Sequence, residues 1–411
     1  MLRTELQAAG LSQHGLQLAR DLGGGFCLLP ERNPMTHPFE AERALFPLLA
    51  SKAQLSSCSQ SALSKPVSAA IARYLDSWRE RGMDWGGWAT VLDDARAEFA
   101  RMIHAEAQDI AVMSCVSDLA SSVGNCLSFV PGKNGIVLGE IDFPSLGHVW
   151  LAQQQRGATV KFVEPDAGGE IALEQYAQAI NADTRLVSVS HVSYSNGFRQ
   201  DIAAIGALAH AQEALFFVDA YQSMGAMAID VVRDGVDMLV CGGQKYLLGC
   251  PGIAFMYVRR DIAQQLRPAN TGWFGRVNPF AFDIRLLDYA DGARRFDTGT
   301  PPYINAAAAG AGMQMLNRMG VEQVEAHIEN LSRVAIETAA NLGLPIASPR
   351  DPRRKGSNTA IRVNDSAAVE RRMAEAGFIV SARGPLIRVA PHFYNTEEEV
   401  AGAMRALARL V

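Results

Sequence analysis

The chain has 411 residues, of which 48% are hydrophobic and 20% charged, a composition typical of a folded protein with a large core. Its net charge of −5, without a strongly basic block, argues against non-specific binding of nucleic acid. The first 15 residues lack an uninterrupted apolar stretch and no apolar run reaches 18 residues, so we expect no signal peptide, no membrane span and a cytoplasmic location.

Short runs rich in Val, Ile and Phe alternate with helix-like segments in the middle of the chain. The predicted strands cover residues 135–142, 159–165, 185–192, 214–220, 237–243 and 252–258. The predicted helices among them include residues 145–157, 173–180 and 201–214. Apolar strands with helical crossovers predict a mainly parallel α/β sheet that is covered on both faces. The last two strands are too close for a helical crossover, so we expect that pair to be antiparallel.

The pattern changes after about residue 300. The predicted elements there are two long helices (305–320 and 321–343), a strand (359–364), a helix (367–377), a strand region (379–391) and a final helix (396–411). This order indicates a smaller α+β domain. We therefore expect three parts: an N-terminal segment, 1–55, that packs with the small domain; a large domain, 56–300; and the small C-terminal domain, 301–411.

Two polar residues stand where the predicted sheet would bind a ligand, outside the carboxyl ends of its strands. Asp219 ends one strand, and Lys245 follows another at the end of "CGGQK". Taken alone, the two could form an ion pair. The chain has no Walker loop, no GxGxxG after its first strand and no GxSxG elbow. What remains is a buried lysine whose pKa is lowered enough to form a Schiff base.

Pyridoxal 5′-phosphate (PLP) needs four further groups from a protein, and the sequence has a candidate for each. Asp219 could hold the pyridine nitrogen, and Gln222, three residues later, could donate to the phenolic oxygen. Phe143, directly after a strand, is either a core residue or a platform for the cofactor ring. Ser117 and Asp118 begin a helix, where Ser117 is either an ordinary N-cap or part of a phosphate site.

The segment "VDAYQSMGAMAIDVVRDGVDMLVCGGQKYLLGCPG" resembles the aminotransferase class V group of PLP enzymes, which have fold type I. The shared pattern is Asp-x-x-Gln or Asp-x-x-His, followed by an Asp-containing strand and then by the Schiff-base lysine. The resemblance extends from residues 56–67 to residues 387–396. It implies a large, mainly parallel sheet of the seven-stranded type with a smaller C-terminal domain, and PLP bound at Lys245 with Gln244 beside it.

Within that group, "DFPSLGHVW", "NTGWFGRVNPFAFD" and "RGPLIRVAPHFYNTEEEV" are similar to segments of kynureninases. The likeness implies that Phe143 stacks on the cofactor ring. It also implies that Trp273 and Thr300 reach the phosphate of a neighbouring subunit, in a homodimer with shared active sites. Arg388 would clamp the substrate carboxylate, although it could also be a surface arginine on a strand. The chain differs from the kynureninase pattern at Leu146, Gln222 and Gln244.

The resemblance implies an enzyme that acts on an α-amino acid through an aldimine and a quinonoid, with Lys245 as the general base. Kynureninase-type hydrolysis, transamination, β-elimination and epimerisation all stay open, and so does a catalytically silent binding protein, against which the Lys245 and Asp219 pair argues. Cysteine desulfurases use a cysteine in the C-terminal domain, whereas Cys250 is the last cysteine here. The scattered cysteines and histidines predict no metal site and no disulfide framework.

Overall fold

The computed structural model describes residues 37–411, so the first 36 residues of the predicted N-terminal segment lie outside the described part. Seven strands form the main sheet, in the order β2-β8-β7-β6-β5-β3-β4. Their bounds are β2 (Ile110–Met113), β3 (Gly135–Gly139), β4 (Thr159–Val163), β5 (Thr184–Ser190), β6 (Leu215–Asp219), β7 (Met238–Gly242) and β8 (Ala254–Val258). The predicted large parallel sheet is therefore confirmed. The sequence reading missed only β2, whose four residues are too few to show a period.

Strand β8 is the exception to the parallel direction. It runs antiparallel to β7, with Met238 opposite Val258, and antiparallel to β2 on its other side. The remaining neighbours in the sheet pair in parallel. The expectation of an antiparallel last pair is thus confirmed, because the short connection from β7 to β8 leaves no room for a crossover helix.

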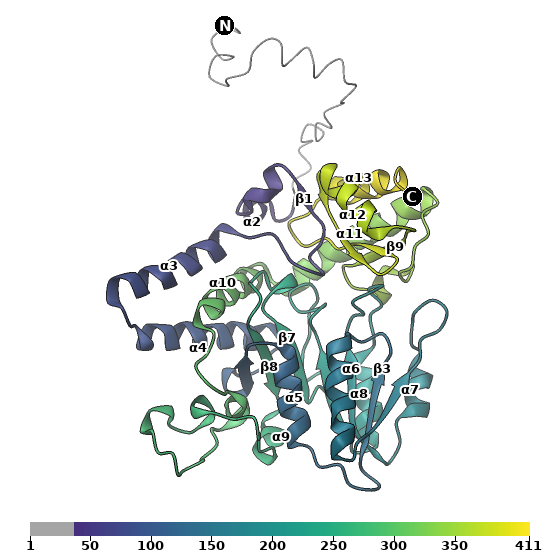
Figure 1. Cartoon of the computed structure of the whole chain (residues 1–411). Helices are drawn as coiled ribbons and strands as arrows, with labels where there is room; N and C mark the ends of the chain where they lie inside the picture. Colours follow the sequence, from purple (N-terminus) through teal and green to yellow (C-terminus); the bar gives the residue numbers. More distant parts are fainter. Residues whose placement is uncertain (1–36) are drawn as a thin grey trace. The chain divides into compact units, whose positions relative to one another are not determined.

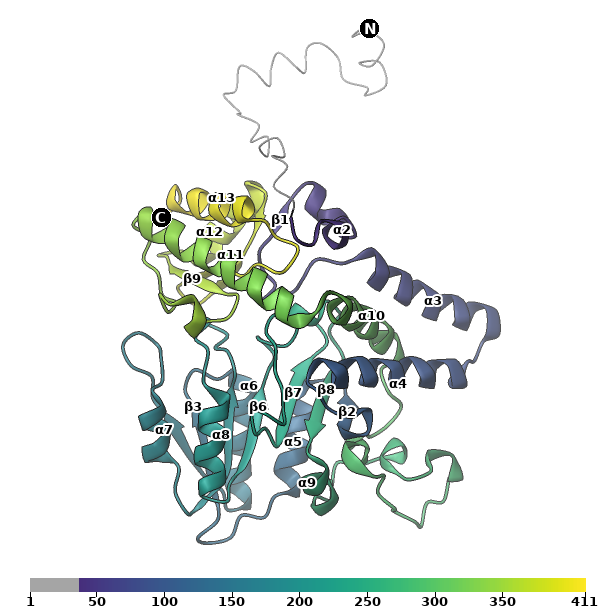
Figure 2. The ribbon, with the colours of Figure 1, turned by 180° about the vertical axis from the view of Figure 1, so that it is seen from behind.

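Helices cover both faces of the sheet (Figures 1 and 2). One face packs against α5 (Val116–Cys126), α6 (Pro144–Ala152) and α9 (Arg260–Gln265). The other packs against α4 (Trp85–Met102), α7 (Leu173–Ala179) and α8 (Ile202–Ala211). Neighbouring residues of β6 divide between the two cores, because Phe217 lies in the first and Val218 in the second. Both faces are therefore apolar, and polar groups collect at the strand ends.

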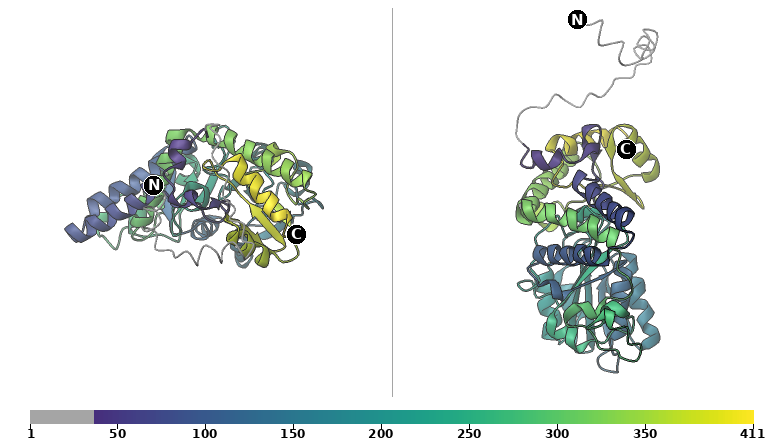
Figure 3. Two further views of the ribbon diagram at one scale, coloured as in Figure 1. Left: turned by 90° about the horizontal axis from the view of Figure 1, so that it is seen from above. Right: turned by 90° about the vertical axis from the view of Figure 1, so that its left-hand side faces the viewer.

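The C-terminal elements form a second core. The antiparallel sheet β11-β12-β9 and the helices around it lie at one end of the described chain (Figures 1 and 3). Its elements are β9 (Thr359–Arg362), α12 (Ser366–Glu375), β10 (Phe378–Ile379), β11 (Ser381–Arg383), β12 (Leu386–Val389) and α13 (Glu397–Ala408). The order of elements matches the α+β pattern expected from the sequence.

Two long helices connect the cores. They are α10 (Tyr303–Met319) and α11 (Val321–Asn341), and α10 packs against α4 and against α3 (Lys65–Arg81). In α11, the residues that pack into the C-terminal core begin at Leu331. The domain boundary at residue 300 stays a prediction, and this packing supports a proposed boundary within α11 instead.

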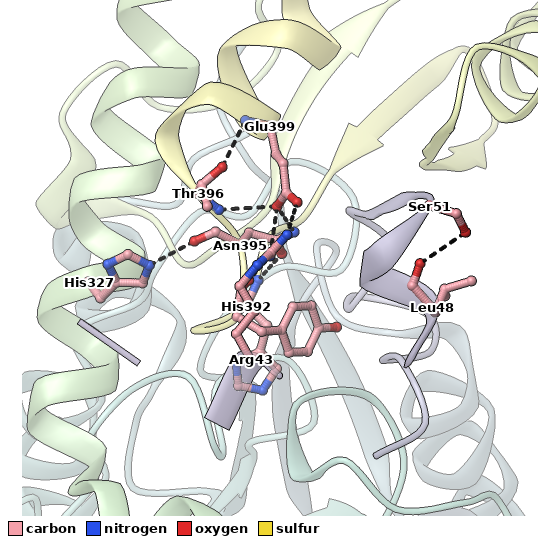
Figure 4. Close-up of polar contacts among 9 residues, drawn as sticks. Arg43, Leu48, Ser51, His327, His392, Asn395, Thr396 and Glu399 are labelled. Atoms are coloured by element: carbon pink, nitrogen blue, oxygen red, sulfur yellow. Dashed lines mark hydrogen bonds and ion pairs between the residues drawn. The ribbon is translucent and has the colours of Figure 1, made fainter. Parts of the chain in front are cut away.

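The start of the described chain lies against the C-terminal elements. Strand β1 (Ala53–Gln54) pairs in parallel with β10, and Arg43 at the end of α2 (Glu40–Arg43) forms an ion pair with Glu399 of α13. Figure 4 shows Glu399 also accepting from the backbone of Thr396, which caps α13. Arg43 and β1 thus lie against the C-terminal elements. The predicted packing of the whole segment 1–55 stays a prediction.

The segment after β8 returns to the sheet through a buried ion pair. The Asp297 carboxylate accepts from Arg96 of α4 at 2.6 Å and from the backbone N–H of Val112 in β2 at 2.9 Å. All three residues are buried. This contact fixes the segment that leads to Thr300. No helix within residues 37–411 combines the length and apolarity that a membrane crossing requires.

We expect Asp297→Ala to lower the free energy of unfolding by about 3–5 kcal/mol, because it leaves the Arg96 cation buried without its partner. Urea unfolding followed by circular dichroism measures this change. Asp76→Ala is the matched control, since Asp76 pairs with Arg79 on the exposed side of α3 and should cost less than about 1 kcal/mol. Equal losses in the two variants would contradict the structural role given to Asp297.

Candidate active site

The fold brings Lys245 and Asp219 to the same end of the sheet. Strands β6 and β7 are parallel neighbours, so Asp219 at the end of β6 and the turn after β7 lie side by side. Lys245 starts a short 3-10 helix (Lys245–Leu247) with φ of +65°, a left-handed backbone that is uncommon for a lysine. This strained conformation at a strand end is typical of a functional position.

Burial acts on both charged groups. It lowers the pKa of the Lys245 amine, and the nearby Asp219 charge opposes that change. It raises the pKa of Asp219, against the opposing effects of the Tyr221 N–H and the Lys245 charge. At neutral pH, the uncharged form therefore makes up a larger fraction of the Lys245 amine than it does for an exposed lysine. This uncharged form is the one that attacks a carbonyl.

Two aromatic rings face this amine. The Lys245 Nζ lies 4.0 Å from the centroid of the Tyr221 ring and 5.7 Å from that of Phe143. Phe143 is 37% exposed, which is high for a core residue, and its ring meets the edge of Tyr194 at 5.1 Å. This position suits the predicted ring platform better than a role in core packing.

Asp219 has one carboxylate oxygen engaged and one available. Oδ1 accepts the N–H of Tyr221 at 2.9 Å, and Oδ2 makes no hydrogen bond to another described residue. Gln222 is buried and donates to the Cys58 carbonyl at 3.1 Å. Its predicted contact with the cofactor's phenolic oxygen stays a prediction.

Helix α5 begins two residues earlier than an N-cap at Ser117 would require. Its N-cap is Cys115, which makes no side-chain capping bond, so the reading of Ser117 as N-cap is wrong. Ser117 and Asp118 lie in the first turn, where backbone N–H groups have no partner within the helix. The Asp118 carboxylate turns back toward the Cys115 thiol. The helix start keeps the positive end that suits a phosphate.

Arg388 is buried on β12, with 1% of its surface exposed, so its reading as a surface arginine is wrong. It donates to the Tyr194 carbonyl at 2.7 Å, to Ser381 at 2.7 Å and to Ser59 at 2.9 Å. Its Nε has no hydrogen-bond partner among the described residues. A buried guanidinium with a free N–H and no carboxylate partner is suited to an anionic ligand.

The segment 56–61 forms a wall of the site that sequence reasoning missed. Ser59 contacts Arg388, and the Ser61 hydroxyl donates to the Lys245 carbonyl. The Cys58 thiol is close enough to act electrostatically on the Lys245 amine. The only sequence signal is the run of small polar residues in "SSCSQS", which no periodic pattern places near the lysine.

Asp142, directly before Phe143, was also missed. Its Oδ1 accepts the N–H of Ser190 at 2.8 Å, while the buried Oδ2 has no partner within residues 37–411. Burial raises its pKa to about 7, with a further increase from the Asp219 charge. The carboxyl group is therefore largely protonated in mildly acidic solution.

Three predicted residues stand apart from this cluster. Trp273 packs its ring on Trp85, Phe280 and Phe282, and none of its ring contacts within the described chain is with Lys245. Thr300 is exposed. Gln244, next to Lys245, is half-buried and makes no side-chain capping bond. Their cofactor contacts remain predictions.

The groups that the structure gathers fit PLP. The uncharged form of Lys245 suits the aldehyde, Oδ2 of Asp219 the pyridine nitrogen, and the start of α5 the phosphate. The free Nε of Arg388 suits a substrate carboxylate. Among the residues described, no three His, Cys, Asp or Glu side chains are grouped as a metal site would require.

Comparisons with known proteins agree with this chemistry. The family model "Aminotransferase class-V" matches residues 56–406. The uncharacterized aminotransferase YcbU of Bacillus subtilis is 41% identical, over 91% of this chain and 98% of its own. A kynureninase of Pseudomonas fluorescens is 26% identical, over 80% and 81%. The apo structure of a cysteine desulfurase from Thermococcus onnurineus has a TM-score of 0.82 at 22% identity, over 93% and 99%, which supports the fold.

We expect Asp142→Asn to become progressively more stable than the wild type as pH rises from 4 to 8. The pKa of Asp142 is 3.8 in the unfolded chain and about 7 in the folded chain. The wild type therefore has the full stabilisation from the protonated carboxyl group below pH 3.8 and loses it as pH rises through about 7. Asparagine does not ionise, so the variant has no such loss. The change should be on the order of 4 kcal/mol, at about 1.36 kcal/mol per pKa unit. Urea unfolding at each pH measures it; a constant difference would contradict the raised pKa.

Proposed function

This chain belongs to the aminotransferase class V family of PLP-dependent enzymes, and from this we propose that it is an aminotransferase acting on an α-amino acid. One observation supports this choice of reaction: Lys245 is a base that faces the site, and burial lowers its pKa. Transamination needs one base that removes a proton and returns it on the same side. The most similar of the relatives reported above is also named an aminotransferase.

Two of the other titratable groups near the amine, Cys241 and Asp219, are poor proton carriers at neutral pH. Burial raises the pKa of the Cys241 thiol well above its usual range, and Asp219 is held by the Tyr221 N–H. The Arg388 guanidinium has only hydrogen-bond donors, so it does not accept the proton. A two-base epimerase needs a second base on the opposite side, and neither of the two rings, Phe143 and Tyr221, is one.

In the proposed reaction, Arg388 binds the α-carboxylate through its free Nε–H and holds the substrate's Cα within reach of Lys245. Bound PLP would supply an electron sink for the negative charge that develops at Cα. Lys245 would take the proton from the substrate's Cα and deliver it to the carbon that was the cofactor's aldehyde, so that the amino group stays with the cofactor and the substrate leaves as a 2-oxo acid. Asp219 would hold a proton on the pyridine nitrogen, and the Phe143 ring would exclude water from one face of the site.

Kynureninase-type hydrolysis is the second candidate, because the relatives include a kynureninase. The segment "DFPSLGHVW", which starts α6, also resembles a kynureninase segment. Desulfurase chemistry is less well supported, since Cys250 is the last cysteine of the sequence and the C-terminal core therefore has none. The cytoplasmic location predicted from the sequence is kept as part of the proposal.

A homodimer with shared sites is also part of the proposal. The loop between Arg276 and Tyr289, closed by a bridge between these two residues, exposes apolar side chains to solvent. They are Val277, Phe280, Phe282, Ile284, Leu286 and Leu287. Exposed apolar clusters of this kind indicate a protein–protein contact. The loop follows Trp273, which the kynureninase likeness assigns to the partner's phosphate.

We expect the wild-type enzyme to convert its cofactor to the amine form in the presence of one or more α-amino acids and to release the matching 2-oxo acid. Mass spectrometry of both products over an amino-acid panel measures this half-reaction. Lys245→Ala should lose the visible absorbance of lysine-bound PLP, whereas Lys52→Ala on the exposed surface should keep it. Release of alanine and anthranilate from kynurenine, without the amine form, would favour hydrolysis instead.

Arg388→Ala should raise the KM for the preferred amino acid by about 10- to 100-fold, because a charged hydrogen bond to the carboxylate is lost. An amine that has the side chain of the preferred amino acid but no carboxylate should react equally slowly with the wild type and with Arg388→Ala. Steady-state kinetics with the two substrates separate carboxylate binding from general damage to the site. An equal loss for both substrates would show that Arg388 does not bind the carboxylate.

The double variant Phe282→Ser/Ile284→Ser should shift the protein from dimer to monomer, since it removes two of the most exposed apolar side chains of the loop. Analytical ultracentrifugation measures the mass. Leu342→Ser, another exposed leucine at the end of α11, is the control and should leave the mass unchanged. A monomeric wild type would contradict the dimer.

A further inference from the structure

Tyr221 lies in the site without a role so far. Its backbone N–H donates to Asp219, and its ring is the closer of the two rings to the Lys245 amine, at 4.0 Å against 5.7 Å for Phe143. A planar ring joined to that amine can therefore contact Tyr221 as well as Phe143.

Gly242, at the end of β7, makes room for the tyrosine. A Cβ at this position would lie 2.0 Å from the Tyr221 Oη and 2.1 Å from its Cζ. No larger residue fits while the tyrosine keeps this place, because both atoms are far inside contact distance. The phenol end is thus held against the strand end, three residues before Lys245.

The hydroxyl makes no hydrogen bond to another residue of the described chain, 37–411. Burial raises the pKa of Tyr221, with additional effects of Cys241, Asp219 and Cys115, so the phenol stays protonated and can donate. The interaction with Cys115, the N-cap of α5, places the side chain near the helix start that suits a phosphate. The hydroxyl is therefore a donor that is available to an acceptor on a bound ligand.

We propose that Tyr221 binds the cofactor: its ring lies against the pyridine ring, and its hydroxyl donates to the phosphate beside the first turn of α5. Gly242 is then a positioning residue that admits the phenol. The proposal rests on the PLP assignment and is independent of the reaction, so it can fail while the proposed aminotransferase activity stands.

The first test compares PLP with pyridoxal, which lacks the phosphate. Tyr221→Phe keeps the ring and removes the hydroxyl, so its apoenzyme should bind PLP about 10- to 100-fold more weakly and pyridoxal with unchanged affinity. Absorbance titration of the apoenzyme measures both dissociation constants. Tyr74→Phe, in α3, is the matched control and should change neither.

Two outcomes would overturn the phosphate contact: unchanged PLP affinity in Tyr221→Phe, or equal weakening for PLP and pyridoxal. Inorganic phosphate is a second probe, because it competes for the phosphate site without a pyridine ring. The phosphate concentration that slows PLP binding should be lower for the wild-type apoenzyme than for Tyr221→Phe. If the two proteins need the same phosphate concentration, the result counts against the contact.

The packing is tested by a double-mutant cycle. Gly242→Ala should lower both the melting temperature and the PLP affinity in the wild type, but much less in a Tyr221→Ala background, where the clashing phenol is gone. Additive effects in the two backgrounds would show that the tyrosine does not occupy this place. Circular dichroism of each variant confirms that it is folded.

Discussion

The whole site depends on burying the Lys245 amine while a carboxylate of opposite charge, Asp219, stays near it. Lys245 stands at the carboxyl edge of a sheet that is apolar on both faces, and burial disfavours its charged form. Asp219 on the neighbouring strand limits that effect, and each group holds the other in a narrow range of protonation. The turn that carries the lysine, the two rings facing it and the segment 56–61 all serve to maintain this dry, balanced environment.

The parts of the molecule that were predictable from sequence are those fixed by neighbours along the chain. A run such as "LFFVD" is a buried strand because every residue but the last is apolar, and its aspartate must then lie at the sheet edge. The same reasoning places Lys245 after β7, and the short loop to β8 dictates an antiparallel pair. Local chemistry thus gave the sheet, the direction of its strands and two central residues of the candidate site.

The rest depends on contacts that no local pattern encodes. The wall formed by Ser59 and Ser61 lies next to Arg388 and Lys245 only because the chain start returns to the finished fold. The role of Gly242 is visible only when the Tyr221 side chain is placed against it. The N-cap of α5 was misjudged because Cys115, which is not a capping residue by preference, holds that position through its extended backbone.

The contact between Ser59 and Arg388 joins residues separated by 329 positions, and that between Ser57 and Tyr394 joins residues separated by 337. Closing such long loops costs chain entropy that other contacts must offset, so we expect these contacts to form late in folding. During synthesis, Arg388 can reach Ser59 only after β12 has left the ribosome. A chain that ends before β12 would therefore lack the carboxylate site proposed above.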